Sequence, residues 1–113
     1  MKGVSICVES GGKVVIGNNV VINATSKSRT ILNAFGGENI IIGDDCLLSD
    51  SIQIHNTDYH SLISNGKRYN YPKSIIIGSH CWIGLNAIIL KGVELSNDTV
   101  VGACSVVSKT VHV

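Results

Sequence analysis

The most regular feature of the chain is an aliphatic residue at every sixth position of its C-terminal third. This register consists of Ile77, Ile83, Ile89, Leu95, Val101, Val107 and Val113. Four residues after each aliphatic there is mostly a small or β-branched residue, such as Cys81 or Ala87, and Gly, Asn, Asp or Ser are frequent in between. A period of six matches neither an α-helix, at about 3.6, nor an alternating strand, at about 2. It predicts short strands joined by tight turns, three of which complete one coil of a solenoid.

The same pattern occurs upstream, but in shifted registers. Ile16 and Ile42 are 26 residues apart, and Ile54 and Ile77 are 23 apart, neither of which is a multiple of six. We therefore expect two insertions, one around Lys27–Asn39 and one over about residues 56–74. A β-sandwich with chance spacing is the alternative, and the unbroken C-terminal register disfavours it.

Composition narrows the class of protein. The 113 residues suit a single domain spanning 1–113, and 16 Ile and 13 Val against 7 Leu favour strands over helices. The net charge is +1, with no Lys/Arg cluster and no long apolar run, so we expect neither nucleic-acid binding nor membrane insertion. The N-terminus lacks a signal-peptide pattern, which predicts a cytoplasmic protein whose four Cys are reduced and mostly buried.

Two C-terminal segments resemble a known family. Residues 75–93 contain Gly78-Ser79-His80-Cys81-Trp82-Ile83-Gly84, and residues 100–109 continue the repeat to Ser108-Lys109. Both resemble the hexapeptide-repeat acyltransferases, particularly the galactoside, maltose and streptogramin-type acetyltransferases and the capsule and O-antigen O-acetyltransferases. The resemblance implies an all-β, left-handed parallel β-helix. The left hand comes from the resemblance alone, since parallel crossovers are otherwise nearly always right-handed.

The resemblance also implies an activity. We expect transfer of an acetyl group from acetyl-CoA to a sugar hydroxyl, in the synthesis of capsule, O-antigen or another surface polysaccharide. It implies a homotrimer with sites between subunits and no metal. Relatives continue past the Ser-Lys pair into a Pro-containing capping segment, whereas this chain ends at Val113. We therefore expect an uncapped last coil. Because the capping segment of the relatives also covers the adenine, its absence would affect the affinity for CoA.

The predicted second insertion carries the reactive side chains. Attack of a hydroxyl on a thioester needs a base, and neutral imidazole, with a reference pKa of about 6.5, suits that role. The resemblance assigns the general base to His60. In the Asp-x-His pattern, Asp58 would orient the imidazole or hold a sugar hydroxyl. His55 and Tyr59 are expected to line the acceptor pocket.

The resemblance places the cofactor along the C-terminal coils. Trp82 would lie beside the reacting centre, between the acceptor and pantetheine. A main-chain N–H near Gly84 and Leu85 would bind the thioester oxygen as it becomes an oxyanion. The remaining expected contacts are the main chain of Ala103 with pantetheine, and Ser108 and Lys109 with the nucleotide phosphates.

Two other functions fit parts of the sequence. The spacing of His55 and His60 matches the histidine pair of a γ-carbonic-anhydrase-like zinc enzyme, but no His precedes His55 to complete the three protein ligands of a catalytic zinc. A non-catalytic β-helix assembly module would bind no CoA, and the Asp58/His60 loop argues against it.

Overall fold

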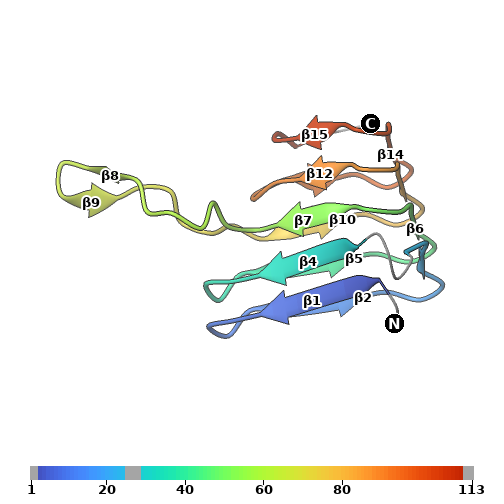
Figure 1. The fold of residues 1–113 in the computed structure, drawn as a ribbon, viewed down its shortest axis with the longest axis horizontal. Helices are drawn as coiled ribbons and strands as arrows, with labels where there is room; N and C mark the ends of the chain where they lie inside the picture. Colours follow the sequence, from blue (N-terminus) through green and yellow to red (C-terminus); the bar gives the residue numbers. More distant parts are fainter. Residues whose placement is uncertain (1–2, 25–28, 111–113) are drawn as a thin grey trace.

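The structure is a computed structural model that describes residues 3–24 and 29–110. Three parallel sheets form the sides of a stack of triangular coils, a left-handed parallel β-helix, as predicted (Figure 1). The first sheet contains β1 (Val4–Val8), β4 (Thr30–Ala34), β7 (Gln53–His55), β12 (Ile88–Ile89) and β15 (Val106–Val107). The second contains β2 (Lys13–Ile16), β5 (Asn39–Ile42), β10 (Ile75–Ile77) and β13 (Glu94–Leu95). The third contains β3 (Val21–Ile22), β6 (Leu47–Leu48), β11 (Trp82–Ile83) and β14 (Val100–Val101).

Stacking of the coils explains the six-residue register. On the third sheet, Leu48 pairs with Ile83, and Ile83 pairs with Val101 of the next coil. All three side chains point inward and are buried. The small residues that precede the strands, such as Cys81 and Ala87, are buried as well, because they fill the narrow interior where the chain enters each side of the triangle. No helix within the described part of the chain is long and apolar enough to cross a membrane.

The turns explain the Gly, Asn and Asp positions. The residue before the small core residue has a left-handed backbone, with φ of 57° at Asp45, 59° at Asn86 and 64° at Asp98. Asn and Asp tolerate this conformation better than most residues. Gly78 is required for a different reason, since a Cβ there would lie 2.7 Å from the backbone nitrogen of Asn97 in the next coil.

The extra residues in the region of the first predicted insertion stay within the stack. Thr30–Ala34 forms strand β4, which pairs with both β1 and β7. Leu32 and Ile42 are ten residues apart, whereas the equivalent Ile89 and Leu95 are six apart, so this side of the coil is longer. Ala34 and Ile40 occupy the added length and are completely buried. The extra residues therefore extend the coil and its core.

Residues 56–74 form a true excursion from the solenoid. The chain leaves after β7 and makes an antiparallel hairpin of β8 (Ile63–Ser64) and β9 (Lys67–Arg68) before it returns to β10. In Figure 1 this hairpin projects to the left, away from the stack. We call residues 56–74 the excursion loop.

Candidate functional site

The candidate residues lie at two different corners of the coil. The corner that follows the first sheet carries the excursion loop with His60 and, two coils along the stack, Ser108 and Lys109. The corner that follows the third sheet carries Leu85 and, one coil on, Ala103. One six-residue side of the triangle separates the two corners, a length of up to about 20 Å at strand spacing. Figure 1 shows the hairpin on the opposite side of the molecule from β6 and β14.

An apolar groove lies at the corner that follows the third sheet. Its volume is about 300 Å³, and its lining residues are Ser49, Trp82, Gly84, Leu85, Val100, Val101, Gly102 and Ala103. At Gly84 a Cβ would lie 2.7 Å from the Ala103 nitrogen, so close stacking keeps side chains out of this position. Within the described residues, the main-chain N–H groups of Leu85 and Ala103 have no hydrogen-bond partner. The groove thus combines apolar walls with free main-chain donors.

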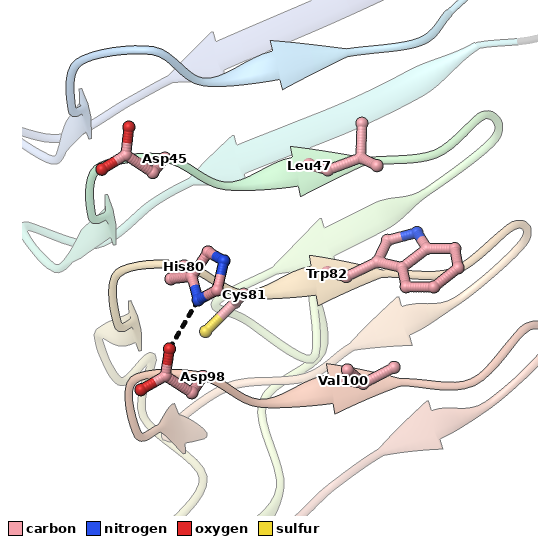
Figure 2. A pocket seen from close by; sticks show the side chains of 7 residues that line it. All are labelled: Asp45, Leu47, His80, Cys81, Trp82, Asp98 and Val100. Atoms are coloured by element: carbon pink, nitrogen blue, oxygen red, sulfur yellow. Dashed lines mark hydrogen bonds and ion pairs between the residues drawn. The ribbon is translucent and has the colours of Figure 1, made fainter.

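Trp82 separates this groove from a second hollow. The indole is half exposed, and its Nε1–H donates to Ser49 Oγ at 3.2 Å. The second hollow, of about 350 Å³, extends from Trp82 to the corner that follows the second sheet (Figure 2). There His80 Nδ1 lies 2.6 Å from Asp98 Oδ1, and both side chains are exposed. Its other lining residues are Asp45, Leu47, Cys81 and Val100.

His60 lies on the exposed part of the excursion loop. No hydrogen bond or ion pair to its ring is recorded among the described residues. Only its main chain is held, because the His60 carbonyl accepts a hydrogen bond from Asn70 Nδ2 at 2.6 Å. The imidazole is therefore available to accept a proton from a bound molecule.

Asp58 contacts residues other than the His60 ring. One carboxylate oxygen lies 2.7 Å from Lys91 Nζ and accepts a hydrogen bond from Asn70 Nδ2 at 3.0 Å. The hydrogen bond from Lys91 is the main cause that lowers the pKa of Asp58. The structure records no hydrogen bond between Asp58 and the imidazole of His60. The Asp58 carboxylate thus ties the excursion loop to the neighbouring coil.

The two ring nitrogens of His55 are both occupied. Nε2 lies 3.0 Å from the carboxamide oxygen of Gln53, which only accepts, so Nε2 carries the proton. Nδ1 then accepts from the Tyr59 hydroxyl, which in turn accepts from Asn33 Nδ2 at 2.8 Å. Burial lowers the pKa of His55. Both nitrogens of the His55 ring are therefore engaged, unlike those of His60.

Tyr59 has an uncommon backbone conformation. Its φ is 66°, in the left-handed region that bulky residues seldom adopt. Edge-to-face packing on Phe35, with ring centroids 5.6 Å apart, and the bonds to His55 and Asn33 hold it there. Tyr59 is the residue directly before His60, so these contacts fix the main chain beside the candidate base.

Several contributing residues had no sequence motif to mark them. Asn70, Gln53 and Asn33 are uncharged amides, a residue type common in loops of any function. Lys91 could have been found from the register, because it follows Ile89 by two positions just as Asn56 follows Ile54, with which Ile89 pairs. Of the four Cys, Cys46 and Cys81 are buried as predicted, whereas Cys104 is exposed. In the described ranges, no three His, Cys, Asp or Glu side chains come close enough together to hold a metal ion.

Known proteins share this repeat and this fold. Residues 74–109 match the family described as "Hexapeptide repeat of succinyl-transferase". A polysialic acid O-acetyltransferase of Neisseria meningitidis is 51% identical over 55 residues, which are 47% of this chain and 26% of that protein. The galactoside O-acetyltransferase of Escherichia coli K12 is 32% identical over 104 residues, 89% of this chain and 47% of that protein. This chain therefore spans less than half the length of these curated relatives.

A solved structure of an acetyltransferase has the same fold as this chain. The maltose O-acetyltransferase from Clostridium difficile 630 superposes with a TM-score of 0.68 at 27% identity, covering 96% of this chain and 58% of that one.

Proposed function

Because this chain carries the repeat and fold of the hexapeptide-repeat acyltransferases, we propose that it transfers an acetyl group from acetyl-CoA to a saccharide hydroxyl. The relatives named as galactoside and polysialic acid O-acetyltransferases support the reaction type and the acceptor class. One structural observation carries the proposal, namely the apolar groove with the Leu85 and Ala103 N–H groups, which no described residue pairs. Such donors suit a thioester carbonyl that develops negative charge.

The proposed chemistry follows from the free imidazole. A ring nitrogen of His60 takes the hydroxyl proton as the hydroxyl oxygen bonds to the thioester carbon. The Leu85 N–H stabilises the oxyanion of the tetrahedral intermediate. Collapse of the intermediate breaks the carbon–sulfur bond, and the imidazolium returns its proton to the departing CoA thiolate. The products are the acetyl ester and free CoA.

The groove also suits the rest of the cofactor. A pantetheine arm is narrow and largely apolar, and Trp82 and Val100, which are paired on neighbouring strands, offer it an apolar surface. Lys109 lies outside the groove, at the corner that follows the first sheet. It is exposed, and as a compact cation it is suited to binding the nucleotide phosphates of a cofactor that extends beyond the groove. Thr110 holds the Lys109 segment in place, because its hydroxyl accepts a hydrogen bond from the Glu94 N–H at 3.2 Å.

The separation of the two corners supports a shared site. His60 and the groove lie at different corners of one copy, so the imidazole of one copy would act on the thioester bound in the groove of another. Trp82 and Val100 expose 50% and 65% of their surface on the third sheet, which gives a second copy an apolar surface to cover. Closed rotational symmetry completes every such site at once, and we propose a homotrimer.

Mixing two inactive variants tests both the reaction and the sharing. His60→Ala removes the base, and Ala103→Arg blocks the groove from an exposed position. The assay measures free thiol released from acetyl-CoA in the presence of a panel of sugars. We expect each variant alone to be inactive and a co-refolded equal mixture to recover about a quarter of wild-type activity, the share of intact sites under random assembly.

The controls separate the two parts of the proposal. The double variant mixed with itself should remain inactive. No recovery in the mixture, with an active wild type, would contradict the shared site. A wild type that neither binds CoA nor releases thiol with any sugar would contradict the acetyltransferase function itself.

A further inference from the structure

Asn70 is the most highly connected side chain of the excursion loop. Its Nδ2 group donates to the His60 carbonyl at 2.6 Å and to Asp58 Oδ2 at 3.0 Å. Its Oδ1 atom accepts from the Leu62 N–H at 2.6 Å. The residue is only 5% exposed in a loop whose other residues are mostly exposed. One carboxamide thus binds the chain on both sides of Ser61.

The carboxamide lengthens the hairpin by one rung. The antiparallel ladder pairs Ile63 with Arg68, and the Tyr69 N–H then donates to the Leu62 carbonyl at 3.0 Å. At the next position the side chain of Asn70 takes the place of a peptide group, with its N–H₂ on the His60 carbonyl and its oxygen on the Leu62 N–H. The His60 segment is therefore held as a strand would be.

A second set of contacts joins this rung to the solenoid. Lys91, at the corner after β12, forms the 2.7 Å ion pair with Asp58 and donates to the Tyr71 carbonyl at 3.4 Å. Asp58 and Tyr71 lie on the two arms of the loop, so Lys91 connects both arms to the same corner. Asn70 then links Asp58 to the main chain of His60.

We propose that Asn70 is a positioning residue that sets the location of the His60 imidazole through its main chain. This inference rests on the proposed role of His60 as the base. The ring itself has no recorded partner among the described residues, so its place depends on where residues 58–62 are held. Reacting groups must be placed to within a fraction of an ångström, and a misplacement of about 1 Å costs on the order of 100-fold in rate.

Two variants of the same loop provide the test. Asn70→Ala removes all three main contacts and leaves the Leu62 N–H and the His60 carbonyl without that partner. Asn65→Gly is the matched control, since Asn65 is exposed at the hairpin turn with a φ of 52° that glycine adopts freely. Trypsin reports on the loop without any need for activity, because Lys67 and Arg68 lie in the hairpin.

For Asn70→Ala we expect cleavage after Lys67 or Arg68, identified by mass spectrometry of the native protein, to be at least about tenfold faster. We expect kcat to fall roughly 10–100-fold with an unchanged KM for acetyl-CoA. Asn65→Gly should change neither quantity. Added to His60→Ala, the Asn70→Ala replacement should cause no further loss of rate, because it acts through His60.

Unchanged tryptic cleavage in Asn70→Ala would overturn the inference. So would an equal loss of rate in the presence and absence of His60, since Asn70 would then act by another route. If the wild type proves to have no acyl-transfer activity, the proposed function fails, and the proteolysis alone still decides whether Asn70 holds the His60 segment.

Discussion

The coils and the excursion loop of this protein are stabilised in different ways. The coils repeat the same main-chain bonds to their neighbours and stack buried aliphatic side chains on one another, as at Ile54 and Ile89. The loop has a two-rung hairpin, and its attachment depends on single side chains such as Asn70 and Lys91. Stability therefore resides mainly in the coils, while the geometry of the reactive group resides in the loop, so replacements should separate the two properties.

The largest effect is expected on the rate. His60→Ala should lower acyl transfer by about 10²–10⁴-fold, or roughly 3–5 kcal/mol of barrier, because a positioned base is lost. The fold and CoA binding should be unchanged, since the ring is exposed. Thiol release, circular dichroism and CoA titration measure these properties.

His55→Ala is the comparison for that variant. We expect a smaller loss of rate, because the His55 ring is engaged by Gln53 and Tyr59. Near-full turnover in His60→Ala together with an inactive His55→Ala would reverse the assignment of the base.

Replacements in the coils should change stability, whereas those in the loop change the rate. Ile54→Ala should lower the free energy of unfolding by about 2–5 kcal/mol, since the side chain is completely buried. Ile63→Ala, in the hairpin, is the matched control: the side chain is 67% exposed and should change stability by no more than about 0.5 kcal/mol. Urea unfolding compares them, and equal losses would contradict the division between coils and loop.

The ion pair that joins the two regions should have an intermediate effect. Asp58→Asn and Lys91→Met should each lower kcat about tenfold by loosening the loop, and lower stability by no more than about 1 kcal/mol, since Asp58 is partly exposed. The exchanged pair Asp58→Lys with Lys91→Asp should recover most of the activity if the pair only attaches the loop. A fully inactive exchanged pair would show that the carboxylate itself acts on His60 or on the acceptor.

The smallest effect is expected from pH. Burial lowers the pKa of His55 in the folded chain from the ordinary value of 6.5, so the unfolded chain binds the proton more readily. The contribution of the buried His55 ring to stability is therefore complete above pH 6.5, and it decreases as the pH falls toward the lowered pKa. His55→Asn should remove this component from the pH dependence of unfolding, whereas the exposed His60→Asn should leave it. If the wild type and His55→Asn had identical curves of unfolding free energy against pH, the contribution of His55 would be contradicted.

Local chemistry explains which features could be predicted from the sequence. A core that repeats every six residues leaves its pattern directly in the chain, and tight turns require Gly, Asn or Asp at fixed places. The β-helix and the second insertion can therefore be predicted from the order of the residues alone. The same period predicts the first insertion, around Lys27–Asn39, but not its form, because the extra residues lengthen one side of the coil as a regular strand instead of leaving the stack.

The order of the residues is thus enough to predict the solenoid, its turns and the polar loop that interrupts it. Three features follow only from the way the coils stack. Asp58 pairs with Lys91, 33 positions away, and Asn70 holds the main chain of His60. The His55 ring is engaged, whereas no described residue engages the His60 ring. The left hand of the coil does not follow from the period either, because it is expected from the family resemblance alone, against the usual right hand of parallel crossovers. The physical reason is that burial and turn geometry are properties of neighbouring residues, whereas these contacts form between segments that meet only when the coils stack.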